Sequence, residues 1–226
     1  MRGGKNDAND SAAICEAVSR PTINAVAIKT AEQQAIQSLH RMRERLIHER
    51  TAKCNQIRSL VAEEELVCPI GIATLRKRLA EIASDESIQI SALLRRLVRL
   101  ALEQLQVLEG WIQQLNEQLR EIFGSTEVCK RPAEVLGIGP VIATAVVGTV
   151  GDPRSFKNGR QFAAWLGLTP RQRSSGNRTL LLGVTKQGGH VSTNAFRSGR
   201  AGGSASGRTA RRRTASMAEA VALAPA

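Results

Sequence analysis

One helical repeat constrains this chain more than any other feature of its sequence. Between residues 94 and 122 the aliphatic residues step alternately by four and three positions, and they are Leu94, Val98, Ala101, Leu105, Leu108, Ile112, Leu115, Leu119 and Ile122. This is the a/d pattern of a coiled coil, carried over four heptads. Two structures are compatible with it: a long helix packed inside the chain's own bundle, for which residues 32–65 could supply the partner, or a coiled coil between chains.

The composition points the same way. Aromatic residues make up 3% of the 226 residues and Tyr is absent, so the core has to be built from Leu, Ile, Val and Ala. Packed helices suit such a core better than sheet sandwiches do, and we expect a mainly α fold. Residues 32–65 carry aliphatic side chains at helical spacing among many Arg, Lys and Gln, which predicts a long basic amphipathic helix. Pro69 and Gly71 should interrupt it.

The two ends of the sequence differ from this helical middle. Asp10 and Ser11 are candidate caps for a helix that runs through Val18 and ends at Pro21, and residues 24–30 alternate enough to form one short strand. Beyond Gly188 the chain is rich in Gly, Ser, Ala and Arg and poor in large apolar residues. Such a tail buries too little surface to offset its ordering entropy, so we expect it to be disordered.

The charge restricts the partners. A formal net charge of +12 attracts polyanions, of which nucleic acid is the commonest. We find no apolar run of about 18 residues and no basic-then-apolar leader, which argues against a membrane protein and for a cytoplasmic one. The four cysteines are scattered without zinc-ligand spacing, so reduced structural thiols are expected.

A tight hinge follows the heptad repeat. In VLGIGPVIATAVV, from Val135 to Val147, a helix that starts near Pro132 should end at Leu136, and a second helix should begin at Pro140. Gly137 and Gly139 lie between them and allow another surface to come close to the backbone. The pattern is typical of a helix-hairpin-helix, whose second helix offers N–H groups to a phosphate. An ordinary αα-hairpin with no ligand would use the same residues.

Several blocks resemble one family in order and spacing. They are KNDANDSAAICEAVSRP near the start, SLHRMRERLIHERTAKCNQIRSLVAEE, the hinge GIGP, FKNGRQFAAWLGLTPRQRSSG and the GVTKQG that follows. Together they cover about residues 4–188 and are similar to the DEDD-type insertion-sequence transposases of the IS110 and IS1111 group. The resemblance implies DNA as the substrate, transposition as the activity, a RuvC-like (RNase H fold) nuclease domain and a nucleoid-associated location. It also admits a guide RNA encoded by the element as a partner.

The resemblance also implies a site. Asp7 and Asp10 match the third and fourth carboxylates of the family's metal site, which would hold Mg²⁺, and at this spacing both fall on one face of a helix. Ser175 matches the serine that attacks a DNA phosphate, with Ser174 as the fallback. The DNA contacts would come from the hinge glycines and from basic residues around the serine, namely Gly137, Gly139, Lys157, Arg160, Arg171, Arg173 and Arg178. Without the family, the Asp pair would be ordinary helix-start charge and SSGN a turn.

The departures from the family leave two readings open. The family's nuclease domain begins with strands that carry the first two metal carboxylates, and these strands do not precede Met1. After residue 188 the low-complexity tail replaces the family's basic helix. We therefore expect a degenerate copy that is truncated at the start and frameshifted at the end. The predicted parts are a nuclease-domain remnant (1–30), a coiled-coil region (31–124) that forms a homo-oligomer, a C-terminal transposase domain (125–188) and a disordered basic tail (189–226). The chain is either a transposase or a non-catalytic, oligomeric nucleic-acid-binding remnant.

Overall fold

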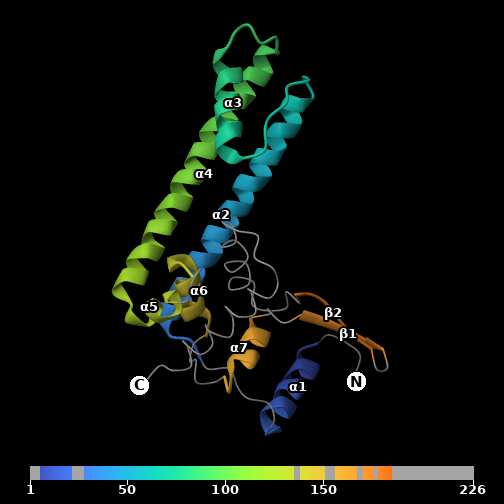
Figure 1. Ribbon diagram of the computed structural model, residues 1–226, viewed down its shortest axis with the longest axis vertical. Helices are drawn as coiled ribbons and strands as arrows, with labels where there is room; N and C mark the ends of the chain where they lie inside the picture. Colours follow the sequence, from blue (N-terminus) through green and yellow to red (C-terminus); the bar gives the residue numbers. More distant parts are fainter. Residues whose placement is uncertain are drawn as a thin grey trace.

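The computed structural model describes residues 6–21, 28–134, 138–150, 156–166, 170–175 and 178–184. Over these residues the chain is mainly helical, as the composition predicts, with one two-stranded hairpin near the end of the described part (Figure 1). The helices are α1 (Asp7–Ser19), α2 (Ala31–Ala62), α3 (Ile72–Ser84), α4 (Ala92–Ser125), α5 (Glu127–Ala133), α6 (Pro140–Val150) and α7 (Gly159–Trp165). The strands are β1 (Pro170–Ser175) and β2 (Arg178–Val184).

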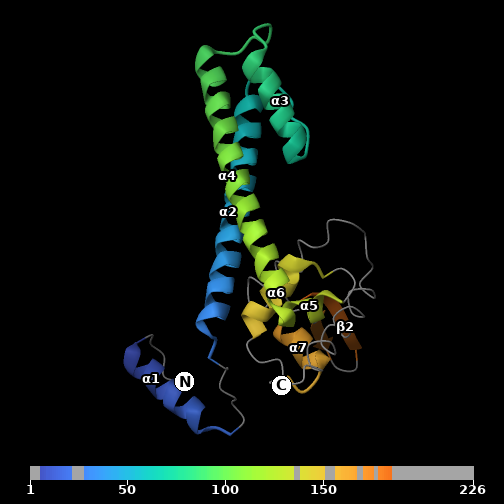
Figure 2. The same cartoon turned by 90° about the vertical axis from the view of Figure 1, so that its left-hand side faces the viewer.

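Two long helices form a stalk. Helices α2 and α4 run side by side along the molecule, and α3 packs on them at the end away from the hairpin (Figure 2). The heptad repeat faces inward, because six of its members are buried: Leu94, Val98, Leu105, Leu108, Ile112 and Leu119. Of the two structures that the repeat allowed, the chain therefore forms the one in which its own residues 31–62 supply the partner helix.

Local hydrogen bonds define where the long helices start. The Thr30 hydroxyl accepts from the backbone N–H of Gln33 at 3.2 Å, and the Gln33 side-chain oxygen accepts from the N–H of Thr30 at 3.1 Å. This reciprocal capping box satisfies two donors that the first turn of α2 cannot pair internally. Ser91 caps α4 in the same position, since its hydroxyl accepts from the N–H of Leu94 at 3.1 Å.

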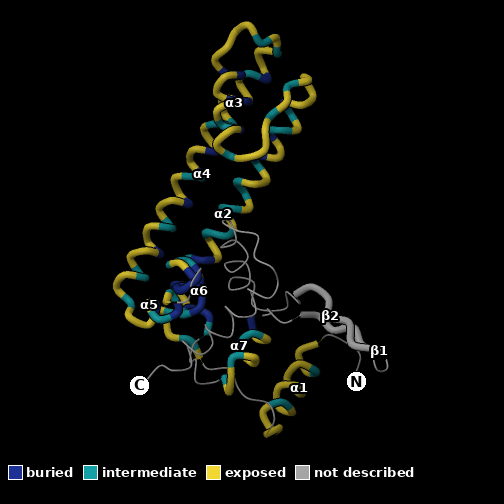
Figure 3. The backbone as a smooth tube through the Cα atoms, viewed as in Figure 1, coloured by how far each residue is buried: buried dark blue, intermediate teal, exposed yellow. Residues whose placement is uncertain are grey.

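The core has two parts, one in the stalk and one at its base. The stalk core joins α2, α3 and the first half of α4 around Leu75, Leu79 and Ile82, none of which is exposed. The second core gathers around α6 and α7 at the other end of the molecule, where Figure 3 shows the densest group of buried residues. Because α6 packs against α2, α4 and α5, the C-terminal segment is attached to the base of the stalk.

The start of the chain corrects two expectations. Asn6, and neither Asp10 nor Ser11, caps α1: its backbone is extended and its side-chain oxygen accepts from the N–H of Asn9 at 2.8 Å. The short strand expected over residues 24–30 falls partly outside the described residues. Within them, residues 28–30 form no strand, and Thr30 is instead the N-cap residue of α2.

The hinge helices agree in part with the expectation. Helix α6 begins at Pro140 as predicted, whereas the preceding helix runs from Glu127 to Ala133 and contains Pro132 instead of starting there. Proline is tolerated in so short a helix because only one intrahelical hydrogen bond is lost with its N–H. The predicted end at Leu136 lies outside the described residues, as do Gly137 and the tail from residue 189.

The hairpin was not anticipated, because the C-terminal segment was expected to be helical. Strands β1 and β2 pair antiparallel, with Ser175 opposite Arg178, Ser174 opposite Thr179 and Arg173 opposite Leu180. Only Gly176 and Asn177 connect the strands, and a two-residue connection of this composition is a typical hairpin signal. The turn predicted at SSGN therefore falls where the two strands meet. None of the helices in the described ranges is long and apolar enough to cross a membrane.

Candidate nucleic-acid interface

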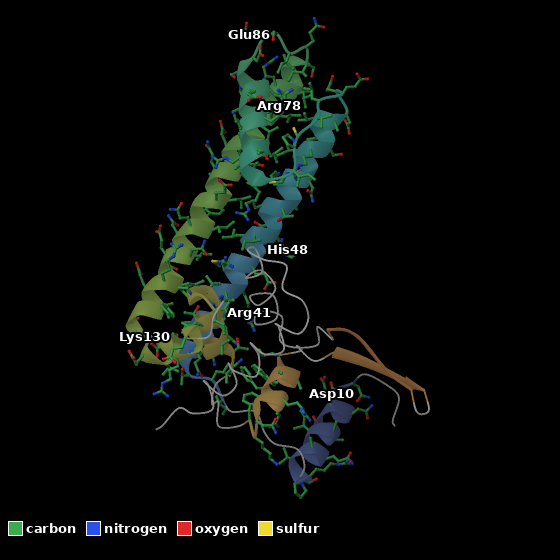
Figure 4. The ribbon with its side chains drawn as sticks, viewed as in Figure 1. Asp10, Arg41, His48, Arg78, Glu86 and Lys130 are labelled. Atoms are coloured by element: carbon green, nitrogen blue, oxygen red, sulfur yellow. The ribbon has the colours of Figure 1, made fainter. Side chains whose placement is uncertain are left out.

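The positive charge is concentrated at one end of the sequence. Residues 28–134, which build the stalk and α5, contain 16 Lys and Arg against 15 Asp and Glu, whereas residues 135–226 contain 13 against 2. Residues 32–65, expected to form a basic helix, carry six of each sign. Both signs are spread along the stalk, as Arg78 and Glu86 at one end and Lys130 at the other illustrate (Figure 4). A polyanion is therefore attracted mainly to the segment that follows the hinge.

Several stalk arginines already have structural partners. Arg95 donates to the carbonyl oxygens of Ile82 at 2.6 Å, Asp85 at 2.7 Å and Ile88 at 2.8 Å, so it ties the end of α3 and the following turn to α4. Arg76 forms an ion pair with Glu109 that links α3 to α4. These cations hold helix to helix, which leaves fewer of them for an external phosphate.

An aromatic cluster supports the segment after the hinge. The rings of Phe156, Phe162 and Trp165 lie 5.2 to 6.2 Å apart between centroids, and Phe162 is 2% exposed in the core around α6. The chain has four Phe and two Trp, so half of its aromatic side chains gather in these ten residues. Lys157 and Arg160 are exposed at this cluster. Two of the predicted DNA contacts thus lie beside a packed aromatic cluster.

The start of α6 offers an anion fewer free N–H donors than the sequence predicts. The N–H groups of Ile142 and Ala143 both donate to the carbonyl oxygen of Gly139 at 3.0 Å, and Pro140 has no N–H. A phosphate at the start of α6 therefore meets fewer donors than an uncapped helix start offers. Gly139 is exposed, and a Cβ added there would meet no atom within 4 Å, so the space beside its backbone is open to a partner.

A buried polar contact, which the sequence analysis did not identify, anchors this hinge to the stalk. The Nε2 atom of His40, on α2, lies 3.1 Å from the hydroxyl oxygen of Thr144, and the Thr144 hydroxyl is 2.8 Å from the carbonyl oxygen of Pro140. Because the carbonyl can only accept, the hydroxyl donates to it and receives the Nε2 proton of His40. Burial, helped by the neighbouring charge of Arg43, lowers the pKa of His40 to about 4, so the imidazole is neutral at pH 7.

The predicted serine lies at the tip of the hairpin. Ser175 is the last residue of β1, and its cross-strand partner is Arg178, the first residue of β2. Arg173 is two positions earlier on the same strand. The backbone register thus brings three predicted site residues together at one end of a two-stranded ladder. Arg171 belongs to β1 as well, within the irregularity between Pro170 and Gln172.

The two predicted metal ligands lie elsewhere. Asp7 and Asp10 are exposed in the first turn of α1, and Figure 4 shows Asp10 on that helix. Mg²⁺ is commonly held by one or two carboxylates together with phosphate oxygens, so the pair fits part of such a ligand set. Among the described residues no group of three or more His, Cys, Asp or Glu could hold a metal ion. In Figure 2, α1 and the hairpin lie on opposite sides of the molecule's base, so the structure does not bring Asp7 and Asp10 to Ser175.

Two of the four cysteines are poorly suited to act as nucleophiles. All four are free, and Cys54 and Cys129 are buried. Burial raises the pKa of Cys129 to about 11, and it also raises the pKa of Cys54. A thiol with a raised pKa stays protonated and is a poor nucleophile.

Two parts of the chain match known transposase families. Residues 1–64 match the DEDD transposase of the IS110 type, and residues 129–197 match the transposase IS116/IS110/IS902 family. The first match covers α1 and α2, and the second covers the hinge, α7 and the hairpin. Together the two regions extend over more than half of the chain.

Curated relatives agree with these matches. The chain is 44% identical to a "Probable family 20 transposase" of Pseudomonas aeruginosa, and the match covers 83% of this chain and 56% of that protein. It is 36% identical to the "Transposase for insertion sequence element IS1111A" of Coxiella burnetii, over 83% of this chain and 52% of the relative. A transposase for element IS1328 of Yersinia enterocolitica is 35% identical over 83% and 55% of the two chains. The chain thus spans about half the length of the curated relatives it matches, and it belongs to the IS110-type insertion-sequence transposase family.

Proposed function

We propose that this chain is the part of an insertion-sequence transposase that holds DNA through residues 125–188 and carries the nucleophilic serine of strand transfer. The uneven distribution of charge along the chain is the main support for this proposal, since residues 135–226 contain 13 basic residues against 2 acidic ones and the stalk is close to neutral. In this proposal residues 31–124 are the helical spacer and residues 189–226 add a basic tail. Residues 1–30 contribute the last helix of a RuvC-like domain.

The proposed reaction is an attack by Ser175 on a DNA phosphodiester. The serine oxygen would form a bond to phosphorus and lose its proton to a base or to solvent. The bond from phosphorus to one sugar oxygen would break, and that oxygen would take up a proton and leave as a hydroxyl. Arg173 and Arg178 are its neighbours in the ladder, and guanidinium groups stabilise the charge that develops on a phosphate. Asp7 and Asp10 would hold Mg²⁺, which could stabilise charge on a phosphate, but α1 lies away from the hairpin in a single chain and this charge does not reach a phosphate at Ser175.

The second reading stays open beside the first. In it the same basic segment binds DNA, or a guide RNA encoded by the element, and no strand is cut. The separation of α1 from the hairpin favours this reading for a single chain, because the carboxylates and the serine do not meet. Binding alone requires only the hinge, the aromatic base with Lys157 and Arg160, and the hairpin.

A salt titration tests the proposed contact surface. Replacing Arg171, Arg173 and Arg178 together by Gln removes three cations, and the slope of log affinity against log salt should fall in magnitude by up to about 2.7. Replacing Arg41, Lys77 and Arg120 by Gln is the matched control, because these exposed residues lie on the neutral stalk. Binding of a labelled duplex from an element end would be measured by fluorescence anisotropy. Equal loss of slope in both triple variants would contradict the assignment.

A covalent-adduct assay separates the two readings. The chain would be incubated with the duplex and Mg²⁺, and DNA that stays attached to protein in SDS would be measured. If Ser175 is the nucleophile, the adduct forms with the parent chain and with Ser174→Ala, and it is absent with Ser175→Ala. Salt-dependent binding without any adduct supports the non-catalytic reading, and an adduct that persists in Ser175→Ala rules out this serine.

A further inference from the structure

An exposed tryptophan ends the short helix α7. Trp165 is 37% exposed, whereas Phe162, one turn earlier, is 2% exposed in the core around α6. The ring of Phe162 lies nearly parallel to the indole, at 19° and 6.2 Å between centroids, and the ring of Phe156 meets the indole at 64° and 5.4 Å. Two packed rings thus fix the orientation of an indole that solvent still reaches.

The exposed side of α7 combines this indole with polar and basic groups. The exposed residues of the helix are Arg160, Gln161, Ala164 and Trp165. With 3.6 residues in each turn they fall within an arc of about 140°. The side-chain oxygen of Gln161 accepts from the backbone N–H of Lys157 at 2.7 Å, so the exposed Lys157 is held at the start of the same side. Residues 156–165 contain no Asp or Glu.

The other exposed tryptophan of the described residues has different neighbours. Trp111 lines a groove of about 810 Å³ between α2 and α4 together with Lys53, Glu49 and Glu103, so one cation is accompanied by two carboxylates. Trp165 instead belongs to the segment from residue 135 onward, in which basic residues outnumber acidic ones by 13 to 2. Of these two indoles, Trp165 is therefore the one that lies where a polyanion is attracted.

We propose that Trp165 stacks on an unpaired base of a DNA strand, while Lys157 and Arg160 bind the phosphates beside that base. Inside a duplex the faces of each base are covered by its neighbours, so a base offers a face to an indole only after it has left the stack. Such stacking tolerates any base, because every base has a π-face. The inference rests on the proposed function, DNA binding by residues 125–188, and adds the form of DNA that this segment holds.

The position of Trp165 in the chain suits this role, since it precedes Ser175 by ten residues. In strand transfer a strand moves from one duplex to another, so base pairs beside the broken phosphate have to separate. A base released in this way loses its stacking partners, and the exposed indole replaces one of them. Trp165 would thus be a positioning residue that stabilises the opened strand and takes no part in the bond changes.

Binding of single-stranded and duplex DNA by the intact chain tests the proposal. The probes are a labelled oligothymidylate of about 12 nucleotides and a duplex of the same length, both followed by fluorescence anisotropy. Trp165→Ala should weaken binding of the single strand by about 10- to 100-fold and leave duplex binding within about twofold. Trp165→Phe keeps a ring and should recover most of the lost affinity. Trp111→Ala is the matched control and should bind both probes as the parent does.

Tryptophan fluorescence gives a second readout that leaves α7 unchanged. In Trp111→Phe the only indole is that of Trp165, and a stacked base should quench its emission when oligothymidylate is added. In Trp165→Phe the only indole is that of Trp111, whose emission should stay constant. Replacing Lys157 and Arg160 together by Gln should lower the magnitude of the single-strand salt slope by about 1.4, whereas Trp165→Ala should leave that slope unchanged.

The outcomes distinguish this inference from the proposed function. Equal loss of single-strand and duplex binding in Trp165→Ala would indicate a structural role and overturns the inference. If the duplex binds with the expected salt dependence while oligothymidylate neither quenches Trp165 nor loses affinity in Trp165→Ala, the inference is overturned and the proposed function stands. If neither form of DNA binds, both fail. Tighter binding of oligouridylate than of oligothymidylate, with the same quenching, overturns the assignment to DNA.

Discussion

Acidification should weaken the attachment of the hinge to the stalk through His40. This side chain is 4% exposed, and its Nε2 proton is received by the Thr144 hydroxyl. Protonation would place a positive charge in the core beside Arg43 and add a donor on Nδ1. The folded chain therefore resists protonation at pH values at which the unfolded chain accepts it.

The size of the effect follows from linkage. The pKa of His40 is about 4 in the folded chain and 6.5 for an ordinary histidine. Above pH 6.5 both states are neutral and His40 adds no pH dependence, while between pH 6.5 and 4 only the unfolded state takes up the proton, so the free energy of unfolding falls as the pH falls. The loss at pH 5 is about 2 kcal/mol. With a denaturant slope of about 2 kcal/mol per molar, the urea concentration at the midpoint of unfolding should be lower at pH 5 than at pH 7.5 by about 1 M.

Urea unfolding followed by circular dichroism at pH 7.5 and pH 5 measures this shift. His40→Gln keeps a side-chain N–H for Thr144 but cannot titrate. Between pH 7.5 and pH 5 the free energy of unfolding of the parent should therefore fall by about 2 kcal/mol more than that of His40→Gln. Carboxylates titrate in both chains and cancel in the difference. His48→Gln is the matched control, because His48 is exposed on the same helix (Figure 4) and its replacement leaves the contact between His40 and Thr144 in place. If the parent and His40→Gln lose equal stability, the reasoning about His40 is refuted.

Two further predictions concern packing, and urea unfolding at pH 7.5 measures both. Gly148→Ala would bring a methyl group to 2.8 Å from the Cγ2 atom of Ile36, where α6 crosses α2, and should destabilise the chain by about 1–3 kcal/mol, whereas Gly110→Ala meets no atom within 4 Å and should stabilise α4 by up to about 1 kcal/mol. The same sign for both substitutions would contradict the packing of α6 on α2. Leu105→Ala removes a fully buried side chain and should cost about 2–5 kcal/mol, while Gln106→Ala should change stability by less than about 0.5 kcal/mol; similar costs would place residue 105 outside the core.

Much of the candidate site was predictable because its residues are close together in the sequence. Pro140 starts α6 by a local rule, since its missing N–H costs nothing in the first turn. The cluster of basic residues after the hinge is likewise visible in a plain count. The roles of Ser175, Asp7 and Asp10 came from resemblance alone and stay predictions. His40 was not found, because one histidine in a helical pattern gives no sign that it will meet a residue 104 positions away.

The sequence by itself determined the helical character, the long helices and the start of α6. These depend on periodicity, capping and proline geometry, which act over a few residues. Only the tertiary structure decided that the heptad repeat of α4 is buried by α2 and α3 of the same chain, because the heptad spacing is equally compatible with a partner helix from another chain. The hairpin register and the contact between His40 and Thr144 were decided there too. Such contacts join segments far apart in the chain, and their free energy depends on burial and partners that local sequence does not specify.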